Sequence, residues 1–377
     1  MLGADRLHLR GVLLPEGEQR DVWVADGLVR LEPVRDAVTL TTRSYLLPGL
    51  VDAHCHIGLE AHGAVPAEVA EQHALAERRA GALLLRDAGS PADTRWIDDR
   101  DDLPRLIRAG RHIARPRRYL RNYGAEIEPD QLVAEVERQV RRGDGWVKLV
   151  GDWIDREVGD LAPLWPAETA KAAIDRAHEL GARVTAHVFG EQAVAELVAA
   201  GIDGIEHGTG ISAELIPLLA ERRVALVPTM LQLDNFERYA QQGEARFPRY
   251  AAHMRALYAR RLDVFAAAHD AGVPIYAGTD AGGYLPHGLV AQEMAALAQF
   301  LGNDSALAAG SWAARRWLGH PDALTEGAPA DFVVLESDPR VDLRVLQAPR
   351  FVVLRGRVVE TGASKSPRSG SERGHTR

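Results

Sequence analysis

The chain has a single cysteine, Cys55, among its 377 residues, so no disulfide can form within it. This scarcity is typical of proteins from a reducing compartment. Long apolar runs are also missing. A membrane-spanning helix needs about 18 apolar residues in a row, and no run in this sequence is close to that length. The first ten residues include charged side chains and lack the apolar core of a signal peptide. We therefore expect a cytoplasmic protein that does not insert into a membrane.

Positive charge is in the minority as well. The sequence has 45 Lys and Arg against 53 Asp and Glu, which gives a formal net charge of -8. An acidic balance argues against nucleic acid or an anionic membrane surface as a partner. We expect a small-molecule substrate instead, and the composition leaves assembly into a homo-oligomer open.

Lysine is the scarcest basic residue, because Lys148, Lys171 and Lys365 are the only lysines in the sequence. The last two lie in a helical pattern and near the C-terminus, where a solvated cation is expected. Lys148 instead sits inside the apolar segment Gly145-Trp-Val-Lys-Leu-Val. A buried lysine can lose its proton, whereas arginine effectively cannot. A lysine in this strand therefore indicates a chemical role, with a buried ion pair as the alternative.

Short β-prone segments lie at both ends of the chain, for example Leu7–Leu14 and Asp331–Leu335. Each is too short to bury an apolar face alone, so we expect residues 1–48 and 330–361 to form one small composite β-sandwich domain. The last segment, 362–377, is rich in Ser, Gly and Arg and is predicted to be disordered.

Residues 49–329 alternate between short apolar strands and helical patterns about eight times. This alternation predicts an α/β fold, a (β/α)8 TIM barrel, with a doubly wound open sheet as the alternative. No G-x-G-x-x-G follows the first strand, which argues against a dinucleotide fold. We expect a helix over Ala167–Leu180 that ends at Gly181, and a lid within 231–270. The predicted strands are Leu50–His54, Ala82–Arg86, Arg118–Asn122, Trp146–Val150, Arg183–His187, Gly204–His207, Val224–Pro228 and Pro274–Gly278.

Polar residues gather where these strands end. His54 and His56 are separated by one residue, so strand alternation sends both imidazoles to one face and Cys55 to the other. Two neutral imidazoles on one face are half of a metal site, since imidazole suits zinc and other transition metals. Taken singly, each histidine could be a satisfied core or capping residue.

The other candidates occupy equivalent positions along the chain. Because the carboxyl ends of barrel strands line the active-site mouth, their side chains should face one small volume. Independent structural residues have no reason to fall at the same end of successive strands, so the joint pattern favours a metal site. The predicted metal ligands are His54, His56, Lys148, His187, His207 and Asp280.

Most of the candidate ligands lie in short segments that form a recognisable set of motifs. These segments are Pro48-Gly-Leu-Val-Asp-Ala-His-Cys-His, Leu85-Arg-Asp-Ala-Gly, Ala186-His-Val-Phe-Gly, Gly204-Ile-Glu-His-Gly, Gly278-Thr-Asp-Ala-Gly and Ala330-Asp-Phe-Val-Val-Leu. The set resembles the motifs of the amidohydrolase superfamily, specifically its imidazolonepropionase-like and prolidase-like branch. The resemblance spans nearly the whole chain except the tail and implies a metal-dependent hydrolase barrel with a composite β-sandwich.

The resemblance also implies a role for each ligand. His54, His56 and Asp280 would bind one divalent ion, and His187 and His207 a second. Lys148 would bridge the two ions as a carbamate formed with carbon dioxide. Zinc is the default metal, with manganese, iron, nickel and cobalt as alternatives. If Lys148 is unmodified, a site with one metal is the alternative.

The implied chemistry is hydrolysis of a C–N bond in an amide, cyclic amide or dipeptide. A metal-bound hydroxide would attack the carbonyl, and Asp280 would carry the proton of the attacking water to the leaving nitrogen. Lactone or ester hydrolysis needs the same machinery and stays open. A mononuclear deaminase on the same barrel and a non-catalytic scaffold are further alternatives, although the first usually lacks the strand-4 lysine and the second is expected to have lost ligands.

Five residues are predicted to contact substrate because each follows a strand: Arg86, Tyr123, Trp153, Tyr284 and His287. Arg86 would be the bidentate partner of a substrate carboxylate, with a salt bridge to a neighbouring carboxylate as the alternative. Two loops depart from prolidase-like relatives. Arg121-Asn-Tyr-Gly-Ala-Glu stands where a Gly-Gly-His-Gly type turn is common, and Gly151-Asp-Trp-Ile where a Gly-Gly pair is common. Both loops shape the pocket, so these departures argue against assuming prolidase activity.

Overall fold

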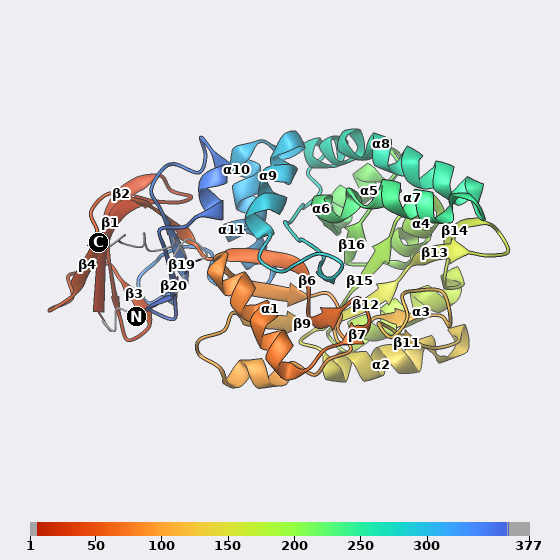
Figure 1. Ribbon diagram of the computed structural model, residues 1–377, viewed down its shortest axis with the longest axis horizontal. Helices are drawn as coiled ribbons and strands as arrows, with labels where there is room; N and C mark the ends of the chain where they lie inside the picture. The colour runs from red at the N-terminus through yellow and green to blue at the C-terminus, as the bar shows by residue number, and fades with distance from the viewer. Residues whose placement is uncertain (1–5, 360, 362–377) are drawn as a thin grey trace, which may run out of the picture.

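The computed structural model describes residues 6–359 and 361. They form a mixed α/β fold with two recognisable parts, a larger part of strands and helices and a smaller part made of one sheet (Figure 1). The predicted disordered tail, 362–377, lies outside the described residues. In the described part of the chain no helix combines the length and the apolar character needed to cross a bilayer.

The smaller part is an eight-stranded sheet built from both ends of the chain, with the order β21-β20-β19-β5-β1-β2-β3 and β4 beside β1. β5 and β19 join the two ends as an antiparallel pair, in which Pro48 faces Phe332. Alternate residues of β1, such as Leu7 and Leu9, are fully buried on one face. The strands are β1 (Arg6–Leu13), β2 (Glu18–Ala25), β3 (Leu28–Arg30), β4 (Val38–Thr41), β5 (Tyr45–Pro48), β19 (Phe332–Leu335), β20 (Phe351–Leu354) and β21 (Arg357–Val359).

The larger part contains two mainly parallel sheets, with the orders β18-β6-β8-β9 and β11-β10-β12-β15-β16-β17. β8, β12 and β16 are buried along their whole length, as expected of parallel strands covered by helices. The strands are β6 (Leu50–Glu60), β7 (Gly63–Ala64), β8 (Ala82–Asp87), β9 (Arg105–Arg108), β10 (Ile113–Ala114), β11 (Ala125–Glu126), β12 (Trp146–Val150), β15 (Arg183–Val188), β16 (Gly204–His207), β17 (Ala225–Val227) and β18 (Ala281–Gly283). A separate hairpin is formed by β13 (Asp152–Asp155) and β14 (Asp160–Pro163).

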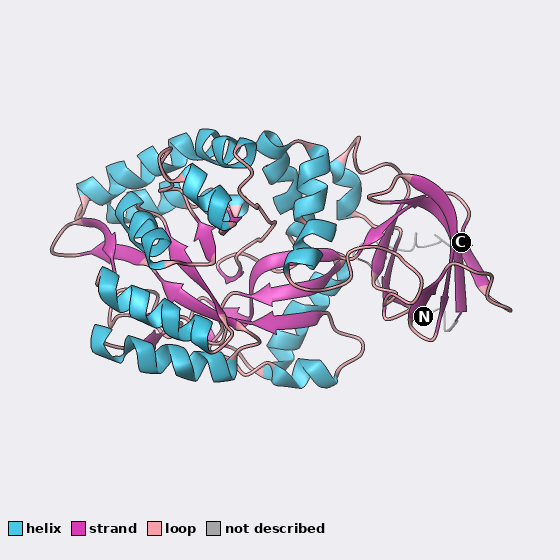
Figure 2. Ribbon diagram, turned by 180° about the vertical axis from the view of Figure 1, so that it is seen from behind, coloured by secondary structure: helices cyan, strands magenta, loops and turns pink. Residues whose placement is uncertain are grey.

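Helices cover the outside of these strands (Figure 2). The helix predicted over Ala167–Leu180 is observed as α3, and Gly181 after it has a left-handed φ of 78°. The helices are α1 (Ala67–Arg79), α2 (Leu132–Arg142), α3 (Ala167–Glu179), α4 (Glu191–Ala200), α5 (Ile216–Arg222), α6 (Met230–Leu233), α7 (Phe236–Glu244), α8 (Pro248–Asp270), α9 (Val290–Leu301), α10 (Asn303–Ala309) and α11 (Trp312–Trp317). Short 3-10 helices span Arg95–Asp99, Pro129–Gln131 and Leu343–Gln347.

The segment 274–277 lies between the two sheets. Leu226 of β17 donates its N–H to the Pro274 carbonyl at 2.8 Å, and Ala53 of β6 donates to the Ala277 carbonyl at 2.8 Å. The predicted strand Pro274–Gly278 is therefore reduced to one bridge, between Leu226 and Ile275, but it does connect β17 to β6.

The predicted strand Arg118–Asn122 is wrong, because these residues form turns and bends. The strands of this region are β9 and β10, which come earlier in the chain. Pro116 has no N–H for a strand ladder, and Arg117 and Asn122 have positive φ angles of 61° and 68°. Tyr119, within this segment, lines a cavity.

Candidate metal centre and its pocket

The first part of the site comes from β6 and the segment before β18. His54 and His56 project from the same side of β6, and their Nε2 atoms lie 3.2 Å apart. The Asp280 Oδ1 atom lies 3.1 Å from the first and 2.8 Å from the second. The side chain of Cys55 faces away, toward the Arg86 carbonyl. One ligand atom from each of the three residues therefore falls within 4.8 Å of the others, a grouping that could hold a metal ion.

The second part comes from the ends of β15 and β16. His187 Nδ1 and His207 Nε2 lie 2.9 Å apart, and the His207 ring centroid is 5.5 Å from that of His54. Lys148 is 1% exposed on the neighbouring β12, where it pairs with Thr185 of β15. Its positive charge lowers the pKa values of His54 and His187, which shows that the three side chains are close. The structure thus brings the six predicted ligand residues into one region.

Burial keeps most of the imidazoles in their neutral form. Desolvation lowers the pKa of His56 and His187 and lowers that of His207 to about 3. For His54, desolvation and Lys148 lower the pKa, but the carboxylates of Glu206 and Asp280 outweigh them and raise it. Neutral imidazole is the form that binds metals, so at least three rings are in the state that a metal site needs.

Three of the four rings have a polar partner beside the nitrogen that faces away from the centre. His54 Nδ1 lies 2.8 Å from Glu206 Oε2, His56 Nδ1 donates to the Gly89 carbonyl at 2.7 Å, and His207 Nδ1 lies 2.7 Å from Thr229 Oγ1. Such outer contacts fix the tautomer and leave the other nitrogen facing the centre. Sequence reasoning missed Glu206 and Thr229, although a carboxylate directly before His207 in an apolar strand was a usable signal.

Arg86 does not reach the pocket. Its guanidinium is 1% exposed, donates to Glu206 Oε1 at 2.6 Å and to the Ala53 carbonyl at 2.7 Å, and stacks over Trp146 at 4.7 Å. The prediction that it binds a substrate carboxylate therefore has no geometric basis, because Nε and Nη2 are used inside the strands and the side chain does not line the cavity. An ion pair was the alternative interpretation of this residue.

His287 is also placed outside the pocket. Its ring is buried against α1, where Nδ1 lies 2.9 Å from Glu77 Oε1 and the ring stacks on His73 at 4.3 Å. The segment 284–288 is thereby anchored to α1. The structure therefore gives His287 a packing role rather than a contact with substrate.

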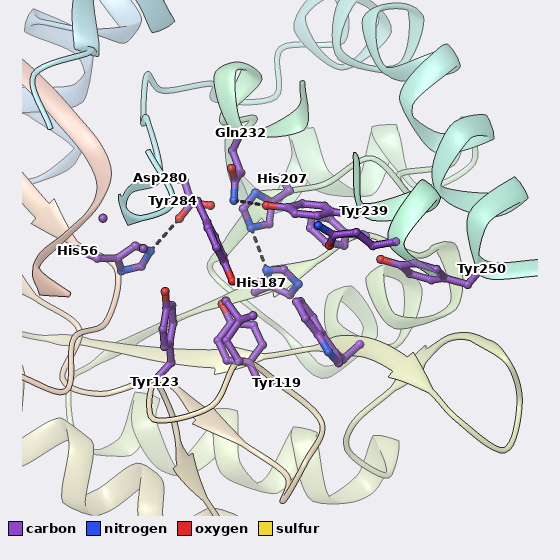
Figure 3. Close-up of a pocket in the computed structure, with 16 residues that line it drawn as sticks. His56, Tyr119, Tyr123, His187, His207, Gln232, Tyr239, Tyr250, Asp280 and Tyr284 are labelled. Atoms are coloured by element: carbon purple, nitrogen blue, oxygen red, sulfur yellow. Dashed lines mark hydrogen bonds and ion pairs between the residues drawn. The ribbon is translucent and has the colours of Figure 1, made fainter. Parts of the chain in front are cut away.

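The other three predicted contact residues, Tyr123, Trp153 and Tyr284, line a cavity in front of the histidines (Figure 3). His56, His187, His207 and Asp280 form its floor. Further wall residues come from the 116–123 turn, the loop after β15, α6, α7 and the start of α8, including Tyr119, Phe189, Gln232, Tyr239 and Tyr250. The lid predicted within 231–270 thus corresponds to a helical wall of the cavity.

His112 was missed because the third strand was misplaced. It is fully buried directly before β10, and its ring centroid lies 5.0 Å from that of His56 and 5.4 Å from that of Tyr119. Neither ring nitrogen has a hydrogen-bond partner among the described residues. Desolvation lowers its pKa well below the usual value. Its position four residues after the short segment Arg105-Leu-Ile-Arg was the signal that could have found it.

Comparison with known proteins places this site in context. Residues 45–365 match the family model described as "Amidohydrolase family". An uncharacterized protein of Mycobacterium tuberculosis is 55% identical over 356 residues, which cover 94% of this chain and 96% of that protein. Ochratoxinase of Aspergillus niger is 29% identical over 231 residues, which cover 59% of this chain and 47% of that enzyme.

Solved structures share the fold at low identity. A putative prolidase from Bifidobacterium longum matches with a TM-score of 0.79 and 23% identity, over 94% of this chain and 95% of that one. A Xaa-Pro dipeptidase with bound methionine matches with a TM-score of 0.77 and 22% identity, over 94% and 100%. The family match confirms the predicted resemblance and the prediction of an amidohydrolase enzyme, and the solved structures share the fold. The imidazolonepropionase-like label stays a prediction. The chain belongs to the amidohydrolase family of hydrolases.

Proposed function

We propose that this protein hydrolyses a C–N bond in an amide, cyclic amide or dipeptide at a centre of two divalent metal ions, with zinc as the default. The observation that carries the proposal is the convergence of His54, His56 and Asp280 within 4.8 Å, beside the 2.9 Å contact of His187 and His207. Family membership and the names of the relatives, a prolidase and an ochratoxinase among them, support the same reaction class.

The donor set fits such ions. The Nε2 atoms of His54 and His56 face one another and the same carboxylate oxygen, an arrangement that a shared cation stabilises. His54, His56 and Asp280 would hold one ion and His187 and His207 the other. The ions would supply Lewis acidity, lowering the pKa of water and polarising the carbonyl under attack.

Asp280 is the proposed proton carrier. Its side chain lies at the floor of the cavity, and His54 and His56 hold its pKa well below the usual range against the opposing effect of desolvation. It would take a proton from the attacking water and give it to the departing nitrogen, which is too basic to leave as an amide anion. The carboxylate thus has to serve both as base and as acid within one turnover.

Lys148 is the proposed bridge between the two ions. Desolvation lowers its pKa to about 8, so the neutral amine is accessible near neutral pH. The amine nitrogen can then add to carbon dioxide and release a proton, which gives an anionic carbamate with two oxygen ligands. The scarcity of lysine elsewhere in the chain supports a selected role for this one.

The proposal extends to the architecture and its setting. Residues 49–329 would form a closed (β/α)8 barrel, since the segment 274–277 bonds to both β17 and β6. Residues 1–48 and 330–361 would form the composite second domain, supported by the pairing of β5 with β19. A cytoplasmic location and a small-molecule substrate belong to the same proposal. Lactone or ester hydrolysis would use the same groups, whereas a mononuclear deaminase would not need Lys148.

Elemental analysis combined with a substrate screen tests the proposal. The purified protein should contain about two transition-metal ions per chain, and mass spectrometry under carbon dioxide should detect a carbamate that Lys148→Arg lacks. The metal-loaded protein should hydrolyse at least one class among N-acyl amino acids, Xaa-Pro dipeptides and cyclic amides. A protein without bound transition metal that cleaves none of them would favour the scaffold alternative.

A further inference from the structure

The cavity in front of the proposed metal centre has an aromatic wall. Tyr119 and Tyr123 enter from the 116–123 turn, and Tyr239 and Tyr250 enter from the helices α7 and α8 (Figure 3). Tyr284 projects between them and is 47% exposed, which places it at the mouth. These side chains offer flat faces at several angles, and such faces pack well against another ring.

The wall is already arranged as a set of edge-to-face contacts near the floor. The Tyr119 ring lies 4.9 Å from that of Trp153 at 72° and 5.4 Å from that of His187 at 68°. Phe189 contacts His187 at 4.4 Å and 67°. An aromatic group bound here would continue a cluster that exists without it.

Positive charge is absent from this wall. Sixteen residues line the cavity, and none of these carries a guanidinium or an ammonium group. Burial raises the pKa of Tyr119, Tyr123 and Tyr239, so these phenols stay neutral at physiological pH. Apart from the groups of the proposed metal centre itself, the surface that meets the substrate is therefore uncharged.

Arg118 and Arg238 are sequence neighbours of wall residues but do not line the cavity. Arg118 donates to Asp155 at 2.6 Å and also to the carbonyls of Trp153 and Ala162. The exposed Arg238 stacks on the rings of Tyr239 and Tyr284, with its guanidinium carbon 5.5 Å from each centroid. It touches the rim without lining the cavity, so a test has to address it.

We propose that the part of the substrate that fills this cavity is an uncharged aromatic group and that a substrate carboxylate is disfavoured there. This inference rests on the proposed C–N hydrolysis and narrows its substrate class. A carboxylate moved from water to this wall would lose its hydration and would meet neutral phenol and amide donors but no cation, which is unfavourable for a charged group. A neutral ring would gain apolar burial and edge-to-face contacts instead.

A matched pair of amides tests the inference: N-acetyl-2-phenylethylamine and N-acetyl-L-phenylalanine, which differ only in the carboxylate. Binding to the metal-loaded protein is measured by calorimetry, and hydrolysis by release of the primary amine. We expect the neutral amide to bind at least tenfold more tightly. Equal affinity, tighter binding of the acid, or binding of neither compound would overturn the inference.

Two variants of neighbouring glutamines sharpen the test. Gln242 of α7 lines the cavity, whereas Gln241 binds Glu237 and does not line it. Gln242→Arg should move the affinity ratio toward the acid by at least fivefold, and the matched control Gln241→Arg should leave the ratio unchanged. A ratio that responds equally to both variants would show that long-range charge, and not the cavity wall, sets the preference.

The variant Arg238→Gln tests whether the arginine at the cavity rim contributes to the preference. If the wall sets the preference, this variant keeps the ratio within about twofold of the unaltered protein. Preference for the acid that disappears in Arg238→Gln would instead identify the rim arginine as a carboxylate anchor and overturn the inference. Selective binding of the neutral amide without any amine release would support the inference about the cavity while counting against the proposed hydrolysis, so the two failures are distinguishable.

Discussion

Three residues at or beside the cavity floor have positive backbone φ angles, which residues other than glycine rarely adopt. The φ angles of His207, Thr229 and Asp280 are 70°, 51° and 58°. A β-branched residue such as threonine is especially unfavourable in this region, and each such residue costs on the order of 1–3 kcal/mol. The surrounding contacts have to hold these angles, and in return His207 and Asp280 turn toward the centre.

The hydroxyl of Thr229 is expected to matter for metal affinity because it lies 2.7 Å from His207 Nδ1. Thr229→Val removes the hydroxyl but keeps the branched shape, so metal affinity should fall about 10- to 100-fold. Thr229→Ser keeps the hydroxyl and serves as the matched control, with affinity close to that of the unaltered protein. Competition with a chelator measures both, and equal affinities in the two variants would contradict the positioning role.

Asp280 has two proposed roles, metal binding and proton transfer, and a substitution can separate them. Asp280→Asn keeps an oxygen ligand but cannot carry a proton, so metal content should be mostly retained while kcat falls by at least about 100-fold. Elemental analysis of the same sample provides the control for metal loss. An unchanged kcat would remove Asp280 from the proposed proton transfer.

At the scale of elements, most of the site could be predicted because strand alternation is local. The Asp-Ala-His-Cys-His run in β6 fixes which side chains share a face, and the equivalent positions of His187 and His207 follow from β15 and β16. The third strand could not be predicted, because β9 has only four residues and β10 only two, and the Tyr119–Leu120 pair that resembles a strand lines the cavity. His112 was lost with that strand.

The ion-pair partners of buried side chains were a second feature that the sequence could not predict. Arg86 follows a strand like the ligands do, but sequence cannot show that Glu206, 120 residues away, takes its guanidinium. The same holds for Glu77 and His287, which meet across 210 residues. Long-range ion pairs of this kind depend on how the strands and helices pack, and that packing is not written in any local pattern.

Glu293 links α9 to α6 and is expected to make stability depend on pH. It accepts the N–H groups of Met230 and Leu231, yet desolvation raises its pKa from 4.5 to about 8. The folded protein therefore keeps a proton that the unfolded chain releases near pH 4.5. Stabilisation from this group is complete below pH 4.5 and is lost as the pH rises through about 8.

Urea unfolding between pH 5 and pH 8 measures this effect. The free energy of unfolding should fall with rising pH in this window, and Glu293→Gln should make the fall shallower. The exposed Glu168 provides a control, since Glu168→Gln should leave the slope unchanged. An identical slope in the unaltered protein and Glu293→Gln would show that the group does not keep its proton in the fold.

At the scale of the whole molecule, the sheet built from both chain ends is expected to contribute to the free energy of unfolding and not to catalysis. Phe332 of β19 is fully buried in the apolar core of that sheet. Phe332→Ala should lower the free energy of unfolding by about 3–5 kcal/mol and leave kcat/KM of the folded fraction within about twofold. Val341→Ala, at a side chain 79% exposed, should change neither. A large loss of kcat/KM in folded Phe332→Ala would connect this sheet to the site.

The antiparallel partnership of β5 and β19 has a consequence for biosynthesis. The ribosome makes Pro48 roughly 280 residues before Phe332, the residue that it faces. At about 5–20 residues per second, the unpaired edge of β5 waits for about 15–60 s on the nascent polypeptide. A message truncated before β19 would release a product with that edge still open, a template for aggregation. Full-length translation is therefore the step that completes this sheet.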